Sequence, residues 1–370
     1  MITRLEFRNK RIFKMIEIRD IEIEGYERVV EAKDKSCGLH AFIAIHSTLL
    51  GPSLGGTRIH PYATEQEALN DVLRLSKAMT YKSAVVKDGL GGGKSVIIAN
   101  PKEKTPALLH AFAQVLNALQ GTYIAAEDMG SSAEDMAIIH EKSPYVAARK
   151  SKGSSGDPSR FTAWGVFRGI QAISKTLWGN HRALRGKRIA IQGLGNVGSK
   201  LAEILFWRGA NLIICDINEE LVEKHRLLYE AEVISSDDFT SVRCDILAPC
   251  AMGAIINETT IKNLHCRAIA GAANNQLCHN DLGAQLQHMG ILYAPDYVIN
   301  AGGIINAAGE FDQEGYHPRR TRDKTDEIYE VLLEIFARSR IENKPTSLIA
   351  DQIAEYNLSH KIGQRTHKIF

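Results

Sequence analysis

Two lysines stand at positions where an ammonium group could bind or react with a small substrate. Lys94 directly follows three glycines, residues 91–93, at the edge of an apolar run typical of a buried β-strand. Glycine has no Cβ to hold another molecule away from the backbone, so this stretch favours a loop against which a substrate lies. A plain glycine-rich turn fits the pattern equally well. Lys82 takes the next position on the apolar stripe of a helix, where a lysine is costly unless it is paired or used; the alternative is a helix-end lysine whose charge reaches solvent.

Asp128 is a third residue that could take part in chemistry. It follows the strand-like run 123–126 and Glu127, and Ser131 and Glu134 behind it form a capping box that predicts a new helix. Proteins that alternate strands and helices place their chemistry at the carboxyl ends of strands, where we expect Asp128. The alternative is a solvated turn carboxylate.

The most specific pattern is a glycine motif between a strand and a helix. The strand is residues 188–192, the motif is Gly193-Leu194-Gly195-Asn196-Val197-Gly198, the helix begins at Ser199, and the next strand, residues 212–215, ends on Asp216. In such a motif the first glycine makes a tight turn, the second admits a pyrophosphate, and the third lets helix and strand pack closely. The helix N-terminus attracts the phosphate charge. Asp216 would bind both ribose hydroxyls and repel a 2′-phosphate, which favours NAD over NADP.

These candidates require an α/β scaffold of two domains. A chain of 370 residues exceeds one ordinary core, and its alternating strands and helices favour a doubly wound parallel sheet. We expect an N-terminal α/β catalytic domain of residues 15–150, to which C-terminal helices of residues 326–370 return. We expect a Rossmann NAD-binding domain of residues 151–325 that begins at the linker 151–159, and we expect residues 1–14 to be a disordered extension. We expect helices from Thr64, Thr105 and Thr162, and late strands that end in turns within residues 246–250, 268–275 and 298–303.

Composition excludes several classes of protein. The chain is 44% apolar and 24% charged with a net charge of +2, so no nucleic-acid or anionic-membrane surface is expected. No apolar run approaches the ~20 residues that cross a bilayer. Six scattered cysteines read as reduced thiols of a cytoplasmic protein. Thirteen histidines without ligand spacing predict no metal site.

These residues resemble the Glu/Leu/Phe/Val dehydrogenases, and among them most the leucine dehydrogenases. The resemblance implies reversible, NAD-dependent oxidative deamination of an L-amino acid by a homo-oligomer, an octamer or smaller. By motif, Lys82 resembles the lysine that binds the α-carboxylate, Lys94 the catalytic lysine and Asp128 the aspartate that exchanges a proton with the amine. Thr162 and Asn275 resemble residues that hold the nicotinamide. The motifs that carry it are Gly51–Arg58, Met79–Lys82, Leu90–Ser95, Ala126–Gly130, Gly153–Pro158, Gly193–Gly198, Cys244–Cys250, Gly271–Gln276 and Pro295–Ile305.

These roles are physically consistent, because two partly desolvated ammonium groups close together lower one pKa toward neutrality. A neutral Lys94 could then take a proton from the water that attacks the iminium carbon, while a charged Lys82 anchors the carboxylate.

The resemblance also places residues around the substrate side chain, all of them apolar, so glutamate is not expected. Branched-chain substrates (leucine, valine and isoleucine) are expected first. Ala307 departs from the larger valine usual in leucine enzymes, Asn274 from a leucine and Gly309 from an acid, so phenylalanine or tryptophan is the alternative. A non-catalytic NAD-binding regulator is a remote alternative. The side-chain pocket is expected at Leu54, Gly55, Ala126, Ile304 and Ala307.

Overall fold

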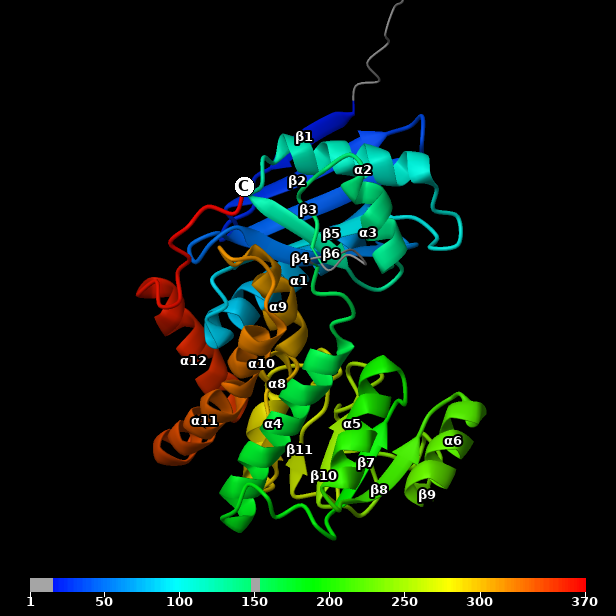
Figure 1. Cartoon of the computed structure of the whole chain (residues 1–370), viewed down its shortest axis with the longest axis vertical. Coiled ribbons are helices and arrows are strands. Elements are labelled where there is room, and N and C mark those ends of the chain that lie inside the picture. Colours follow the sequence, from blue (N-terminus) through cyan, green and yellow to red (C-terminus); the bar gives the residue numbers. More distant parts are fainter. Residues whose placement is uncertain (1–15, 148–153) are drawn as a thin grey trace, which may run out of the picture.

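The computed structural model describes residues 16–147 and 154–370, which contain two six-stranded sheets at opposite ends of the molecule (Figure 1). Residues 1–14 and the first part of the predicted linker, residues 151–153, lie outside the described residues. The two-sheet architecture confirms the predicted α/β fold class, whereas the domain boundaries at residues 150 and 325 stay predictions.

The first sheet is mixed, with the strand order β1-β2-β3-β5-β4-β6. Strands β5, β4 and the edge strand β6 run parallel, and β3 pairs with β5 antiparallel. The glycines expected in a loop before Lys94 instead form the first residues of β5, a buried strand between β3 and β4. The strands are β1 (Glu17–Ile21), β2 (Arg28–Asp34), β3 (Leu39–Ser47), β4 (Ser53–His60), β5 (Gly91–Ile98) and β6 (Tyr123–Glu127).

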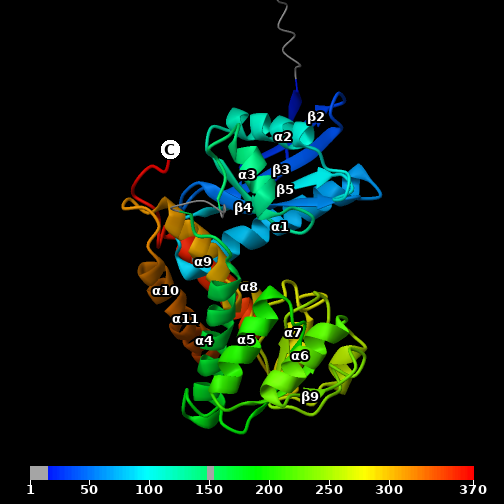
Figure 2. The same cartoon turned by 45° about the vertical axis from the view of Figure 1, so that its right-hand side comes forward.

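Helices cover both faces of this sheet (Figure 2). Helix α1 (Glu65–Val86) packs on β3 and β5, and α2 (Pro106–Ala118) and α3 (Ala133–His140) cover the other face. Thr64 caps α1 as predicted. The second capping box is one residue later than predicted: Ser132 caps α3 together with Asp135, because Ser131 bonds the turn at Asp128 instead.

The second sheet is wholly parallel, with the order β12-β11-β10-β7-β8-β9 of a doubly wound fold. Helices α4 and α5 pack on one face and α7 on the other. Helix α4 begins at Ser159 and α5 at Asn196, each three residues before the predicted start. The elements are α4 (Ser159–Trp178), β7 (Arg188–Gln192), α5 (Asn196–Trp207), β8 (Asn211–Cys215), α6 (Glu219–Tyr229), β9 (Glu232–Val233), β10 (Ile246–Pro249), β11 (Ala268–Ile269), α7 (Leu282–His288) and β12 (Leu292–Tyr293).

The prediction of a strand around Val298 and Ile299 is wrong. These residues belong to helix α8 (Asp296–Ile299), followed by α9 (Gly302–Ala308), and the last strand of the sheet is β12. A short apolar run has no periodicity that separates strand from helix. The helix start is stabilised by Asp296, whose Oδ1 accepts a 2.7 Å hydrogen bond from the Tyr297 N–H.

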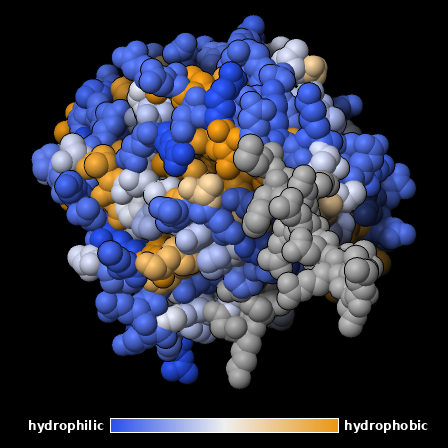
Figure 3. All heavy atoms as spheres, turned by 90° about the horizontal axis from the view of Figure 1, so that it is seen from above, coloured by the Kyte–Doolittle hydropathy of each residue, from blue (hydrophilic) through white to orange (hydrophobic). Residues whose placement is uncertain are grey.

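The C-terminal helices connect the two ends of the molecule. These are α10 (Pro318–Asp326), α11 (Ile328–Glu342) and α12 (Thr346–Ser359). Helix α11 packs on α4, and α12 returns to α1 of the first half, as the predicted fold class requires. Seen from the end that carries the first sheet, the molecule shows mainly hydrophilic residues around small hydrophobic patches (Figure 3). Among residues 16–147 and 154–370, no helix has the length and apolar character needed to cross a membrane.

Candidate active site

A cavity of about 320 Å³ lies between the two halves of the molecule and gathers most of the predicted reactive residues. Lys82 enters it from α1, Lys94 from β5 and Asp128 from the end of β6. The second half contributes residues of α4, α5 and α9. The lining consists of Leu54, Gly55, Gly56, Met79, Lys82, Lys94, Ala126, Glu127, Asp128, Pro158, Thr162, Val197, Ala272, Asn274, Asn300, Gly303, Ile304 and Ala307.

Glycines 91–93 do not line this cavity, which corrects the expectation that a substrate lies against them. A Cβ on Gly91 would overlap the Ser47 carbonyl, and one on Gly92 the Thr80 backbone nitrogen. A Cβ on Gly93 would lie 2.7 Å from the Tyr123 ring. The protein itself fills this space, so the glycines serve close packing of α1 and the neighbouring strands against β5.

Lys94 and Asp128 form an ion pair inside the cavity. Lys94 is 7% exposed, and the Asp128 Oδ1 accepts a 2.7 Å hydrogen bond from the Met129 N–H. Burial raises the pKa of Asp128, but the positive charges of Lys94 and Arg58 outweigh that effect and lower it. The carboxylate is therefore held ionised beside the ammonium group.

Lys82 has a different environment. Among the described residues it forms no ion pair. Its pKa is lowered to about 8, mainly by burial and also by the charge of Lys94, although Asp296 and Asp128 oppose the shift. The sequence predicts a lowered pKa at Lys94, but in the structure Lys94 pairs directly with the Asp128 carboxylate. Among the described residues, Lys82 is the cavity lysine that is buried without a direct ion-pair partner.

Part of the cavity lining forms an apolar wall. Leu54 and Ala126 come from the first half, and Ile304 and Ala307 from α9. Met79, the first residue of the motif Met79–Lys82, also lines the cavity. Among the described lining residues, no arginine and no histidine is present.

The glycine motif has the geometry expected of a dinucleotide site. Gly193 has a φ of +91°, and a Cβ on Gly198 would overlap the Gly193 carbonyl, so this packing requires glycine. A Cβ on Gly195 would meet nothing within 4 Å, so the space beside it is open to a ligand. Asp216 accepts hydrogen bonds from the N–H groups of Leu194 (2.6 Å) and Asn218 (2.8 Å), which hold its carboxylate at the motif.

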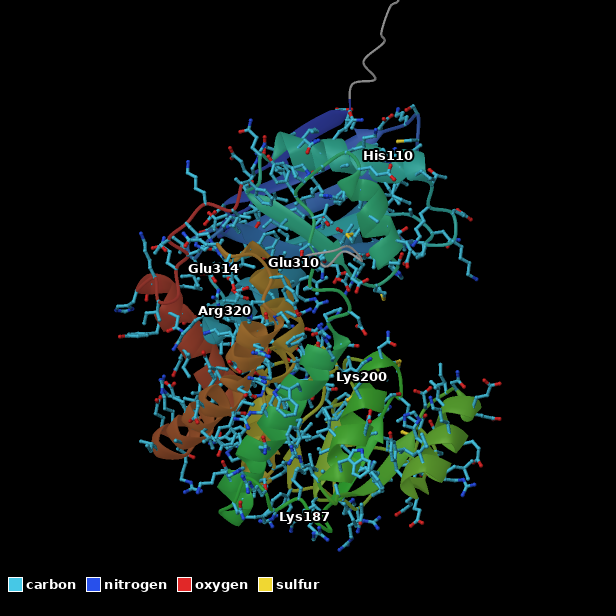
Figure 4. All side chains as sticks on the ribbon, in the orientation of Figure 1. His110, Lys187, Lys200, Glu310, Glu314 and Arg320 are labelled. Atoms are coloured by element: carbon cyan, nitrogen blue, oxygen red, sulfur yellow. The ribbon has the colours of Figure 1, made fainter. Side chains whose placement is uncertain are left out.

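The linker between the halves is tied to the region after α9. The Glu310 Oε1 accepts hydrogen bonds from the Ser154 and Ser155 hydroxyls, at 2.8 and 2.6 Å. Lys200, near the start of α5, lies 3.5 Å from Asp157 of the linker. Figure 4 shows Lys200 at the end of α5 nearer the first sheet and Glu310 between the two halves. These contacts set where α9 and α5 stand around the cavity.

Comparison with known proteins identifies the family. A model described as Glu/Leu/Phe/Val dehydrogenase, dimerisation domain, matches residues 23–145. A second model, described as Glutamate/Leucine/Phenylalanine/Valine dehydrogenase, matches residues 153–225 and 214–344. The chain belongs to this family.

Individual Glu/Leu/Phe/Val dehydrogenases are similar over nearly the whole chain. The leucine dehydrogenase of Thermoactinomyces intermedius is 47% identical over 337 residues, which cover 90% of this chain and 91% of that protein. The phenylalanine dehydrogenase of Caldalkalibacillus thermarum is 41% identical over 92% of this chain and 93% of its own. The crystal structure of L-tryptophan dehydrogenase from Nostoc punctiforme superposes with a TM-score of 0.80 at 40% identity, covering 91% of this chain and 97% of that one.

Some residues predicted to bind the cofactor, from the glycine motif or from the family resemblance, lie outside the lining of this cavity. Thr162 and Val197 line it, but Gly193, Gly195, Asn196, Gly198 and Asp216 lie at the glycine motif and the end of β8. Asn275 is exposed, in a left-handed conformation with φ +51°, and its carbonyl accepts a hydrogen bond from the Ala254 N–H (2.6 Å). The role given to Asn275 stays a prediction.

Asn300 was missed as a site residue. It lines the cavity and donates from Nδ2 to the Ala272 carbonyl (3.0 Å) and the Asn274 Oδ1 (2.7 Å). Its own Oδ1 is buried and has no hydrogen-bond partner among the described residues. The sequence predicts a turn in this region, but only the tertiary structure shows that Asn300, directly after α8, lines the cavity.

One group of metal-ligand types exists in the described residues: Glu31, His40 and Glu65. Its Glu31 carboxylate already pairs with Arg19 and Lys33, both at 2.8 Å. These cations compete with any metal ion for the same oxygens. The absence of a metal site stays a prediction.

Proposed function

We propose that the chain is an NAD-dependent branched-chain L-amino acid dehydrogenase that oxidatively deaminates leucine, valine and isoleucine to 2-oxo acids and ammonia. The observation that carries the proposal is one cavity in which an unpaired lysine, a lysine–aspartate pair and an apolar wall meet. Each part matches one part of an aliphatic amino acid: carboxylate, amine and side chain.

The residues divide the reaction between them. Lys82, when protonated, binds the substrate α-carboxylate. Asp128 accepts a proton from the α-ammonium group, and Lys94 exchanges a proton with the water that adds to the iminium carbon. When bound, NAD would be the acceptor of the hydride that leaves Cα. Closure of the two halves over the cavity would exclude water from these charges.

The glycine motif is the feature that fits NAD. The open space at Gly195 leaves room for a pyrophosphate at the N-terminus of α5, where N–H groups face it. Asp216 favours NAD over NADP because its charge repels a 2′-phosphate. Replacement of Asp216 by alanine should erode the preference, measured as the ratio of kcat/KM for the two cofactors. An unchanged ratio would remove Asp216 from this role.

The apolar wall supports an aliphatic substrate. No cation other than the two lysines lines the described cavity, so nothing would pair with the second carboxylate of glutamate. One methylene in such a pocket discriminates by only ~1–3 kcal/mol, so several branched-chain substrates should react. NADH formation from leucine, valine, isoleucine, phenylalanine, tryptophan and glutamate tests this; absence of turnover with every branched-chain substrate would contradict the proposal.

An aromatic substrate is the second candidate, favoured by the small Ala307 in the wall and by the similarity to L-tryptophan dehydrogenase. The substitution Ala307→Val separates the two. If the space beside Ala307 holds an aromatic ring, valine should depress turnover of phenylalanine and tryptophan far more than turnover of leucine. Equal effects on both classes would leave Ala307 without a role in selection.

Replacement of Lys94 distinguishes an enzyme from a protein that only binds NAD. Lys94→Ala should lower kcat by about 10²–10⁴-fold while NADH binding is retained. Lys224→Ala, on the exposed surface of α6, is the matched control and should behave as the parent. An inactive parent that still binds NADH would instead support a non-catalytic regulator.

We also propose that the chain assembles as a homo-oligomer. The support is the dimerisation-domain description of the model that matches residues 23–145. Light scattering of the purified protein gives the number of subunits, and a monomer would contradict the proposal.

A further inference from the structure

Arg58 stands beside the Lys94–Asp128 pair but has no part in the roles assigned above. It lies on β4 two residues after Gly56, so both face the same side of the sheet. A Cβ on Gly56 would lie 2.7 Å from the Asp128 Cβ and 3.1 Å from the Lys94 Nζ. This face of β4 therefore carries no side chain at the ion pair itself, and the next side chain along it is Arg58.

The Arg58 guanidinium is held in place by a neighbouring helix. Its Nη1 donates a 2.7 Å hydrogen bond to the Oδ2 of Asp71 on α1. Asp71 also accepts from the Tyr62 hydroxyl (2.7 Å) and from Arg74 (2.8 Å). The Arg58 side chain is only 18% exposed, and its Nε is buried without a hydrogen-bond partner among the described residues. A buried charge with an unpaired donor is costly, so we expect another interaction or a function of Arg58 to compensate for this cost.

The other end of the guanidinium faces Asp128. The distance from Nη2 to the Asp128 Oδ2 is 3.7 Å, which is too long for a hydrogen bond but close enough for strong charge interaction. Lys94 makes the direct contact with the same oxygen. Arg58 thus adds positive charge without taking the position from which a proton is exchanged.

We propose that Arg58 is a positioning residue: anchored by Asp71, its fixed charge keeps Asp128 ionised and oriented as the acceptor of the substrate's amine proton. The inference rests on the proposed role of Asp128. An arginine suits this task because it stays charged at every working pH, so its contribution to the field at Asp128 stays constant.

The charged surroundings of Asp128 support this assignment. It is influenced by Lys94 from β5, Arg58 from β4 and Lys82 from α1, and the phenol of Tyr123 on β6 is also within its field. Burial raises the Asp128 pKa, while Lys94 and Arg58 lower it. The Arg58 guanidinium remains a cation beside the carboxylate at every working pH.

The test is the pH profile of kcat/KM for the amino acid in Arg58→Gln. Without the guanidinium the Asp128 pKa should rise, so the acidic limb should move to higher pH by about one pH unit. Lower kcat with an unchanged KM for NAD is expected, and Arg58→Lys should restore part of the profile because it keeps the charge. A profile that superimposes on the parent, with only thermal stability altered, would overturn the proposal.

Arg74→Gln is the matched control. Arg74 shares the Asp71 carboxylate with Arg58 but is exposed and makes no ion pair with Asp128. Its loss should leave the pH profile as in the parent. A shift as large as that of Arg58→Gln would mean that the Asp71 cluster, and not the charge facing Asp128, controls the profile.

A second readout does not depend on activity. The pH dependence of the free energy of unfolding is compared with and without Asp128→Asn, first in the parent and then together with Arg58→Gln. An Asp128 pKa below its unfolded value contributes stability that is lost as pH falls through the folded pKa. This loss should be smaller and should end at a higher pH when Arg58 is replaced, because the folded pKa then lies closer to the unfolded one; an unchanged loss would contradict the inference. A parent inactive on every amino acid would contradict the proposed function, yet this comparison would still decide the effect of Arg58 on Asp128. If Arg58→Gln does not fold, Arg58→Met, which also removes the charge, replaces it in both measurements.

Discussion

Gly92 of β5 lies directly against Thr80 of α1, so closely that a Cβ on the glycine would overlap the threonine backbone nitrogen. Two residues further along each element stand Lys94 and Lys82. The close approach of strand and helix therefore brings two lysines, twelve positions apart in the chain, to one cavity. The glycine-rich run allows the close packing of β5 on α1 that brings Lys82 and Lys94 to the same cavity.

Replacement of Gly92 by alanine should separate α1 from β5 or prevent folding. The added Cβ meets backbone, which cannot rotate away, so we expect a loss of about 3 kcal/mol or more of unfolding free energy. Urea denaturation measures it. A stable Gly92→Ala protein with parental kinetics would show that α1 does not depend on this contact.

The reverse pattern is expected for Gly195→Ala. Its Cβ would meet no atom of the protein within 4 Å, so stability should stay within about 0.5 kcal/mol of the parent. The methyl group would enter the space proposed for the pyrophosphate, so the Kd for NADH should rise about tenfold or more, a change of about 1.4 kcal/mol. Fluorescence titration with NADH measures this Kd; parental affinity would place the cofactor elsewhere.

Binding of a carboxylate should depend on the charge of Lys82. Because burial lowers its pKa to about 8, Lys82 loses its proton as the pH rises above that value, and affinity for the carboxylate should fall. The ligand for the measurement is a 2-oxo acid, which has no amine to titrate. Lys82→Arg should remove this fall, since arginine remains charged. A parental Kd that stays constant from pH 7 to about 10 would refute the assignment.

The C-terminal segment is anchored by Arg365. Its side chain is 5% exposed and donates to the Gly89 carbonyl from Nε (3.1 Å) and to the Phe311 carbonyl from Nη1 (2.6 Å). Arg365→Ala would leave these acceptors unpaired, so we expect a loss of about 2–4 kcal/mol. Arg340→Ala, on the exposed face of α11, is the control and should cost less than about 0.5 kcal/mol. Similar midpoints of thermal unfolding for the two variants would mean that the segment is not held by Arg365.

Local signals in the sequence predicted much of the scaffold. The strand of residues 188–192 and the glycine turn after it depend on neighbours in the chain, and the structure has both as expected. The cap at Thr64 and the first turn at Pro106 are local for the same reason. By contrast, the strand prediction for residues 298–299 is wrong. Burial among distant helices decides whether so short an apolar run is helical, and the local sequence does not contain that information.

The limits of local reasoning are clearest in the site itself. The sequence alone determined which reactive groups exist and where each falls on its own element: Lys82 on an apolar stripe, Lys94 before a strand core, Asp128 at a strand end. It also misread the glycines before Lys94 as space for a substrate. Tertiary structure decided that α1 fills this space, that Asp128 pairs with Lys94, and that burial lowers the pKa of Lys82. The physical reason is that desolvation and charge interaction depend on distances across the fold, which no pattern along the chain contains.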